Sequence, residues 1–179
     1  TAGDRNQHAP LHALGGKGVF VREIEECLLN GEADLAVHSM KDMPAELPQG
    51  LCFADAWEGE DPRDALVLRQ GIDEQTLHAL PCVIATGSLR RAAQLKRLYP
   101  KVTCVDIRGN VETRLARMEE RQLDGLVLAA AGLIRLGLRS RIARCFDEEE
   151  MVPAPAQGML ALECRTQDED LLALLRRRS

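Results

Sequence analysis

The chain has 179 residues, of which 45% are hydrophobic and 28% are charged, and its formal net charge is −5. This composition is typical of a soluble globular protein and excludes a disordered chain. The negative charge argues against a general attraction to nucleic acid or anionic lipid. Aromatic residues make up only 3%, too few for base stacking on single-stranded nucleic acid. We therefore expect no nucleic-acid partner and no membrane, since no apolar run is long enough to span one.

The charges and cysteines are unevenly placed. Residues 89–118 contain eight Lys or Arg and two acids, which indicates a small anionic ligand rather than a polyanion. The six cysteines form no C-x-x-C and no cluster with metal-ligand spacing. We expect no metal site, a reducing cytoplasmic location and a monomer.

Apolar spacing predicts the elements in chain order. The first is an amphipathic helix over 19–30, which Gly31 ends. Short apolar runs predict strands over 34–39, 51–56, 64–69, 82–85, 102–107, 126–130 and 159–164. Helices are expected over 89–98, 111–120, 133–136 and 168–177, with Ser88 as the N-cap of the first of these.

Alternating strands and helices predict an α/β protein with mostly parallel sheets. Two proline-marked joints, at 60–62 and 153–155, enclose a regular β-α repeat. We predict one domain inserted in another, with residues 1–62 and 153–179 as the first and 63–152 as the second. When the chain passes between two domains twice in this way, a ligand cleft is expected between the domains.

Polar groups follow three of the predicted strands, where ligands of open α/β sheets bind. One set is Ser39, Lys41 and Asp42. The others lie at helix starts, where backbone N–H groups and Arg forks can take carboxylates: Thr86, Ser88, Arg90, Arg91, Arg108 and Arg114. Each set also has a plain interpretation, because a Lys-Asp pair in a loop is usually solvated.

Three other positions remain open at this level. The glycine-rich stretch 15–18 lacks the first glycine and the Ser/Thr of a phosphate-binding loop, so we interpret it as a mobile flap carrying Lys17. Gln157 is either a site residue or a hinge residue bonded to backbone. Arg135 is either a ligand-binding residue or an ordinary surface arginine on a short helix.

Seven segments together resemble the hydroxymethylbilane synthase family, also called porphobilinogen deaminase. In chain order they read GGKGVFVREIE, DLAVHSMKDMP, EDPRDALV, GSLRRAAQL, IRGNVETRL, LAAAGLIRLGL and PAPAQGMLALECR. The order and spacing match over nearly the whole chain.

The resemblance implies a transferase that joins four porphobilinogen molecules head to tail, with loss of ammonia, into hydroxymethylbilane for tetrapyrrole and haem biosynthesis. Its partners are porphobilinogen and the growing oligopyrrole. Growth begins on a dipyrromethane cofactor, which a thioether joins to a cysteine of a third domain. Domains one and two of the family resemble type-II periplasmic binding proteins.

The resemblance also implies roles for single residues. Asp42 matches the catalytic carboxylate, and Lys17 matches a lysine of the flap over the active site. Residues that match groups holding substrate or cofactor carboxylates, or lying beside them, are Ser39, Lys41, Thr86, Ser88, Arg90, Arg91, Arg108, Arg114, Arg135 and Gln157.

The chain departs from the family pattern at Ala13, Ala85, Gly87 and Ala156. The first β-α-β segment, the third domain and its cofactor-carrying cysteine have no match here, so we expect the chain alone to be inactive. The alternative is a catalytically silent module of the same fold that binds a polycarboxylate or tetrapyrrole. A ligand sensor of this fold is a third reading, but we find no DNA-reading helix.

Overall fold

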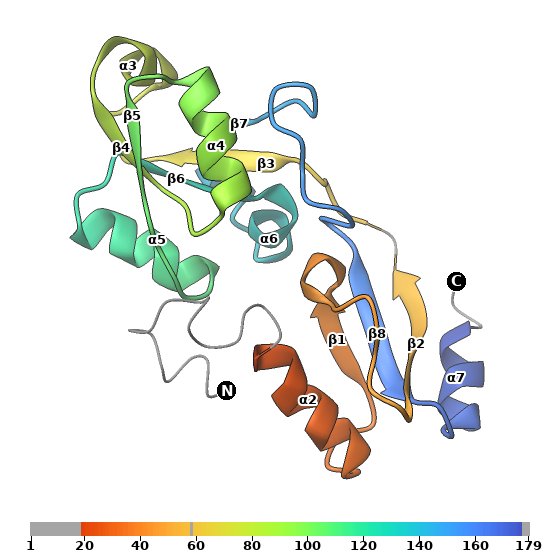
Figure 1. The fold of residues 1–179 in the computed structure, drawn as a ribbon. Helices are drawn as coiled ribbons and strands as arrows, with labels where there is room; N and C mark the ends of the chain where they lie inside the picture. The colour runs from red at the N-terminus through yellow and green to blue at the C-terminus, as the bar shows by residue number, and fades with distance from the viewer. Residues whose placement is uncertain (1–18, 58, 177–179) are drawn as a thin grey trace. The chain divides into compact units, whose positions relative to one another are not determined.

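The computed structural model describes residues 19–57 and 59–176 (Figure 1). The chain folds into two compact units, residues 1–59 with 159–179 (unit 1) and residues 60–158 (unit 2). Unit 2 is therefore inserted in unit 1, as expected, while the finer domain boundaries given above stay a prediction. No helix in the described ranges is long and apolar enough to cross a membrane.

Unit 1 is a three-stranded antiparallel sheet with a helix on each face. Its elements are α2 (Val19–Leu29), β1 (Ala36–Ser39), the 3-10 turn η1 (Met40–Asp42), β2 (Leu51–Trp57), β8 (Leu160–Arg165) and α7 (Glu169–Arg176). The strand order is β1-β8-β2. Leu28 of α2 packs on Ala36 and Leu51, whereas Leu175 of α7 packs on Leu162 and Cys164 (Figure 1).

Unit 2 is a five-stranded mixed sheet in the order β5-β4-β6-β3-β7. Strand β4 runs parallel to β5 and β6, and β3 runs antiparallel to β6 and β7. The elements are β3 (Asp64–Leu68), α3 (Glu74–Ala79), β4 (Cys82–Ala85), α4 (Leu89–Leu98), β5 (Val102–Val105), α5 (Val111–Glu120), β6 (Gly125–Ala129), α6 (Ala130–Arg135), the 3-10 turn η2 (Arg139–Arg141) and β7 (Arg144–Cys145).

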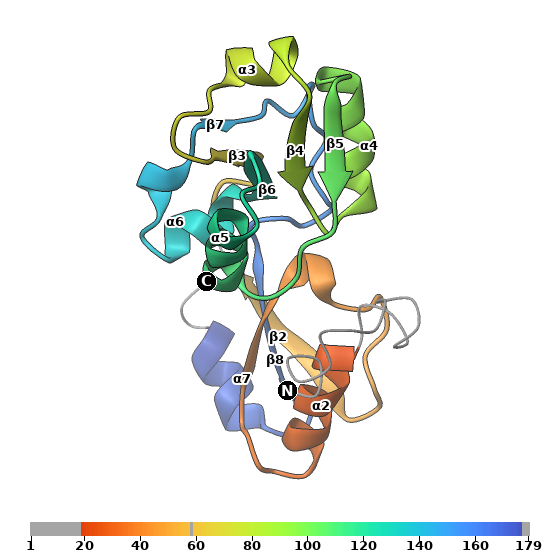
Figure 2. The ribbon, with the colours of Figure 1, turned by 90° about the vertical axis from the view of Figure 1, so that its left-hand side faces the viewer.

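Helices cover both faces of this sheet, because its central strands are apolar on both sides. Leu95 of α4 and Leu77 of α3 belong to one core cluster. Met118 of α5 and Leu133 of α6 belong to the other (Figure 2). The loops that follow β4 and β5 therefore run from the sheet to opposite faces.

The expected α/β class is confirmed, and α4, α5 and β4 have their predicted bounds. The prediction of mostly parallel sheets is wrong for unit 1, because its described strands are all antiparallel. Helix α3 was not predicted, since its six residues are too short for a clear apolar period. Cys145 lies in the short strand β7, opposite Ala65 of β3.

The segment that leads back toward β8 has unusual backbone geometry. Ala156 has a φ of 57° and Gly158 a φ of 94°. A Cβ on Gly158 would lie 2.2 Å from the carbonyl oxygen of Glu60, whose N–H donates to the Gly158 carbonyl at 3.1 Å. Close backbone approach thus requires glycine at 158, whereas Ala156 carries a side chain in a region that favours glycine.

We predict that Ala156→Gly raises the free energy of unfolding of unit 2 by about 0.5–1 kcal/mol, because relief of the left-handed conformation outweighs the added chain entropy. Urea denaturation followed through the ring signals of Tyr99, the chain's one tyrosine, measures this. Ala93→Gly on the exposed face of α4 is the matched control and should lower stability by about 1 kcal/mol. A loss of stability in Ala156→Gly would contradict the assignment of strain.

Candidate functional site

The first predicted site lies in unit 1, where β1 ends in the turn η1. Asp42 is exposed and Lys41 is half-buried. The N–H of Met40 donates to the carbonyl of Met159 at 3.0 Å, and that of Met43 donates to the carbonyl of Met40 at 3.1 Å. The turn thus holds a carboxylate in solvent at a fixed place beside the sheet.

The second and third predicted sites share one edge of the sheet in unit 2. Because β4, β5 and β6 are parallel, the residues that follow them lie at their common carboxyl edge. Asp64, at the start of the antiparallel β3, pairs with Ala129 at the end of β6 and so reaches the same edge. The predicted residues that the structure gathers along this edge are Thr86, Ser88, Arg90, Arg91, Arg108, Arg114 and Arg135.

Asp64 is the centre of the polar contacts at this edge, and it is fully buried. Its Oδ2 accepts from Nη1 of Arg90 at 2.6 Å, and its Oδ1 accepts from Nε of Arg91 at 2.8 Å. Nε2 of Gln157 donates to Oδ1 at 2.9 Å and to the carbonyl of Pro62 at 2.7 Å. One carboxylate thus links β3, α4 and the segment that returns toward β8.

Burial alone would raise the pKa of Asp64, but the Arg90 hydrogen bond, the Arg91 charge and the Gln157 bond together hold this pKa below its usual value. Asp64 is therefore ionised in the folded protein at neutral pH. With two guanidiniums and one carboxylate, the cluster keeps one excess positive charge.

The two arginines are presented differently. Arg91 has 7% of its side chain exposed, and its Nε, Nη1 and Nη2 donate to Asp64, to the carbonyl of Val127 and to Oε1 of Gln157. Arg90 has 27% exposed and also donates to the carbonyl of Val152. Arg90 is thus the more accessible of the pair to an anionic ligand.

The two hydroxyls of this turn serve the start of α4. Ser88 Oγ accepts from the N–H of Arg91 at 3.4 Å, which confirms Ser88 as the N-cap. Thr86 is buried, and its Oγ1 accepts from the N–H of Ser88 at 3.3 Å. Both hydroxyls therefore fix the direction in which Arg90 and Arg91 leave the helix.

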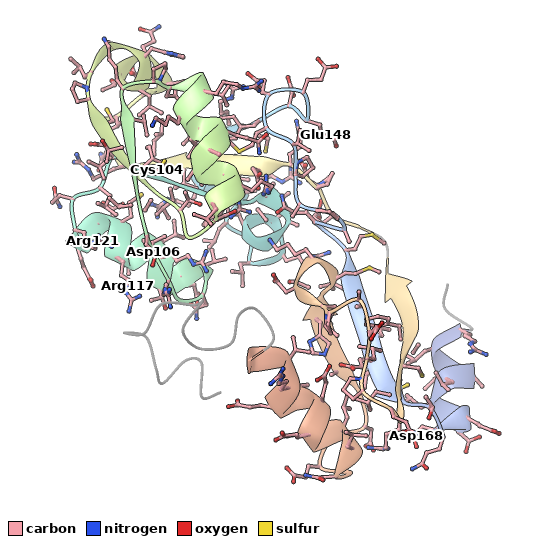
Figure 3. All side chains as sticks on the ribbon, in the orientation of Figure 1. Cys104, Asp106, Arg117, Arg121, Glu148 and Asp168 are labelled. Carbon is pink, nitrogen blue, oxygen red and sulfur yellow. The ribbon has the colours of Figure 1, made fainter. Side chains whose placement is uncertain are left out.

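Arg108 and Arg114 flank the loop that opens α5. Arg108 Nε donates to Asp106 at 3.1 Å, and Arg114 Nε donates to the carbonyl of Gly109 at 2.6 Å. Two further arginines hold the same loop: Arg117 of α5 donates to the carbonyl of Arg108, and Arg121, directly after α5, donates to the carbonyl of Asp106 (Figure 3). The loop is therefore rich in positive charge and held by side-chain bonds to its backbone.

Arg135 is exposed at the end of α6 and donates to the carbonyl of Gly158 at 2.5 Å. Gln157 is buried and bonded to side chains as well as backbone, so it acts in the Asp64 cluster. Lys17 and Ala13 lie outside the described residues. In the part of the chain that is described, no group of three or more His, Cys, Asp or Glu is placed to hold a metal ion.

Asp64 was not predicted as a site residue from the sequence, although it lies in the family-like segment EDPRDALV. The available signal was a charged residue at the first position of a fully apolar strand, directly after Pro62-Arg63. A carboxylate in such a place needs a cationic partner, and Arg90-Arg91 was the nearest unexplained pair of cations.

We predict that Asp64→Asn lowers the free energy of unfolding of unit 2 by about 3 kcal/mol, because it leaves two arginines without their buried counter-charge. Since the folded pKa lies below the ordinary 3.8, the stabilisation is present above that value and is lost as pH falls through the folded pKa. Urea titrations from pH 7 to pH 2, read through Tyr99, measure both effects. Asp61→Asn is the control: it breaks the more exposed pair with Arg63 and should cost at most about 1 kcal/mol. Equal losses in the two variants would contradict the central place of Asp64.

Comparison with known proteins agrees with this architecture at two levels. Residues 1–173 match the family model described as "Porphobilinogen deaminase, dipyromethane cofactor binding domain". Among solved structures, the periplasmic VFT2 domain of Bordetella pertussis BvgS is similar with a TM-score of 0.50 at 22% identity, over 88% of this chain and 65% of that one. Its double mutant gives 0.51 at 21% identity, over 88% and 66%. These likenesses show the fold alone, and they confirm the expected periplasmic-binding-protein type.

Curated relatives are far more similar in sequence. The porphobilinogen deaminase of Syntrophomonas wolfei is 49% identical over 179 residues, 99% of this chain and 58% of that protein. Those of Lachnospira eligens and Bacillus subtilis are 52% and 50% identical, over 96% and 97% of this chain and 59% and 55% of theirs. The chain thus spans little more than half the length of these relatives. A family match over almost the whole chain, together with an arginine-lined sheet edge, shows that the chain belongs to the porphobilinogen deaminase family.

Proposed function

We propose that the protein carrying this chain is a hydroxymethylbilane synthase, which joins four porphobilinogen molecules into hydroxymethylbilane with loss of ammonia. The observation that carries the proposal is the row of arginines along one sheet edge of unit 2, in a chain of this family. Unit 1, described by itself, presents an exposed carboxylate, Asp42. Porphobilinogen bears two carboxylates and an aminomethyl group, so it matches both kinds of side chain.

The residues present fit a dipyrromethane cofactor, because its acetate and propionate groups suit guanidinium donors. When bound, it supplies the pyrrole carbon to which the first substrate is joined. Arg90, Arg108, Arg114 and Arg135 are the partly or fully exposed arginines proposed to hold its carboxylates and those of the growing chain. Arg91, turned inward, is proposed to act together with Asp64.

We propose that Asp42 acts on the nitrogen end of the substrate. Its carboxylate would hold the ammonium group, which already carries the proton that leaves with ammonia. It would then stabilise the cation left when the C–N bond breaks, and accept the proton that is lost after the new C–C bond has formed. Such stabilisation raises the reaction rate because it is stronger in the transition state than in the bound substrate. Lys41 and Ser39, on the same turn, would hold the substrate's own carboxylates.

We further propose a place in haem biosynthesis, a cytoplasmic location and a monomer without nucleic-acid partners. The acidic net charge of −5 supports the last point. Six free thiols in the described residues agree with a reducing compartment.

We predict that Asp42→Asn, in the protein extended to the length of its relatives, lowers kcat for hydroxymethylbilane formation at least about 100-fold with an unchanged fold. The amide keeps the shape of the side chain but neither carries the negative charge nor accepts the proton. Product formation is followed by absorbance after oxidation to porphyrin, and the fold by circular dichroism. Glu46→Gln, an exposed carboxylate of the same loop, is the control and should keep full activity. Near-normal turnover by Asp42→Asn would contradict the role, and an inactive parent would favour the silent binding module.

A second prediction concerns the attachment of dipyrromethane, which needs a reactive thiol. Cys82 and Cys164 are buried, and burial raises the pKa of both, that of Cys164 to about 11. Burial also raises the pKa of Cys27, Cys104 and Cys145. Cys52 lies opposite Cys164 in the β2–β8 pair and shares a hydrogen bond with it. We therefore expect none of the six thiols to carry the cofactor.

Intact-mass measurement of the 179-residue chain, produced in cells that make porphobilinogen, should show the mass of the unmodified polypeptide. The control is the protein extended to the length of its relatives, which should carry the dipyrromethane increment. An increment on the 179-residue chain that maps to any of its six cysteines would make it self-sufficient and would overturn this prediction.

A further inference from the structure

Three ionisable side chains are buried in unit 1 and take no part in the function proposed above. Glu25 on α2 is 5% exposed, His38 on β1 is 8% exposed and Glu163 on β8 is fully buried. His38 Nε2 lies 2.9 Å from Glu163 Oε2. Oε1 of Glu25 and Oε1 of Glu163 are also buried and have no hydrogen-bond partner among the described residues.

Such a cluster is costly for a core of this size. A buried carboxylate oxygen without a partner loses its hydration and gains nothing in return. Replacement of buried ionic groups by apolar ones of similar volume is often neutral or stabilising. The packing of α2 on the sheet, through Leu28, Ala36 and Leu51, does not require these groups.

The cluster lies at the base of the turn that carries Asp42. In the β1–β8 ladder, Ala36 is opposite Glu163 and His38 is opposite Ala161, so the His38–Glu163 bond crosses the ladder diagonally. Ser39 follows His38, and η1 begins at the next residue. The Met40 N–H to Met159 carbonyl bond is the next tie in the same direction. The His38–Glu163 pair is therefore the last side-chain bond that the structure describes between β1 and β8 before the turn.

The charged groups that face the cluster come from three elements. Burial, then the charge of Glu163, raise the pKa of Glu25, while the charges of His38 and Arg22 oppose this rise. On β8, Arg165 points to the end of α2 and donates to the carbonyls of Leu28 and Ala33. Strand β2 contributes the uncharged Leu51 and Phe53 opposite Arg165 and Glu163. Burial and the charge of Glu163 thus both disfavour the charged form of Glu25.

We propose that His38 is a positioning residue for Asp42. Its bond to Glu163 ties the last residues of β1 to β8 and so fixes the place where the turn with Asp42 leaves the sheet. The proposal rests on the proposed function only for the role of Asp42, whereas the effect on the turn is a property of the 179-residue chain itself.

The first test measures hydrogen exchange at the amides of Met40 and Met43 in the 179-residue chain by NMR, corrected for intrinsic exchange. His38→Leu, which leaves Glu163 without a partner, should speed exchange about tenfold. His38→Gln keeps an N–H donor for Glu163 and should stay within about twofold of wild type. Asp34→Asn removes the negative charge from the 2.8 Å pair with Arg165, outside this cluster, and should leave both amides unchanged.

The pH dependence separates positioning from general packing. A carboxyl with a raised folded pKa stabilises the fold below its unfolded pKa, and this contribution is lost as pH rises through the folded pKa. Wild-type protection at Met40 and Met43 should therefore fall as pH rises through the folded pKa of Glu25, which lies above the ordinary 4.5. Glu25→Gln keeps the neutral form at every pH, so the part of this fall that Glu25 causes should be absent in it. If His38→Leu does not fold, Glu163→Leu decides, because it removes the acceptor of the His38 bond, and it must speed exchange at the two amides.

The second test uses the protein extended to the length of its relatives. His38→Leu should lower kcat about tenfold and leave KM within about twofold, and His38→Gln should restore kcat. Wild-type exchange rates in His38→Leu, or in Glu163→Leu where that variant decides, would overturn the proposal even with an active enzyme. Losses of protection in Asp34→Asn equal to those in His38→Leu would overturn it as well. An inactive parent protein would instead refute the proposed function, and the exchange measurements would still decide the role of His38.

Discussion

The buried carboxylate of Asp64 is the interaction on which the arginine-lined edge depends. Two adjacent arginines in the first turn of a helix oppose the helix dipole and repel each other, so without a counter-charge they would turn toward solvent. Asp64 holds both arginines against the protein: its Oδ2 accepts from Arg90, and its Oδ1 accepts from Arg91 and from Gln157. Its hydrogen bonds thus convert an unfavourable pair of charges into a fixed, singly positive surface.

The two neighbouring arginines differ in how much of their side chains is exposed and in what they contact. All three guanidinium nitrogens of Arg91 donate hydrogen bonds to protein acceptors, whereas part of the Arg90 side chain is exposed to solvent. An arginine held on one side by a carboxylate loses little side-chain entropy when it binds an anion on the other. The buried ion pair is therefore better understood as a contact that fixes Arg90 in place than as a source of stability, which buried pairs seldom supply.

Much of this could be predicted from the sequence, because apolar period and turn chemistry are local. The bounds of α4 and α5 and the N-cap at Ser88 follow from such local signals. The antiparallel sheet of unit 1 does not, since β8 inserts between β1 and β2 from more than 100 residues away in the chain. The partners of Asp64 and His38 were missed for the same reason: each bond joins residues that only the completed fold brings together.

Asp42 and Asp64 show how the fold gives one side chain two uses. Asp42 follows a strand and stands in solvent on a short turn. Asp64 begins a strand, is fully buried and has its oxygens occupied by arginines and Gln157. A carboxylate that must exchange partners during a reaction has to be reachable, and one that must hold others in place has to be saturated. The end of the strand on which each aspartate lies decides which of the two it becomes.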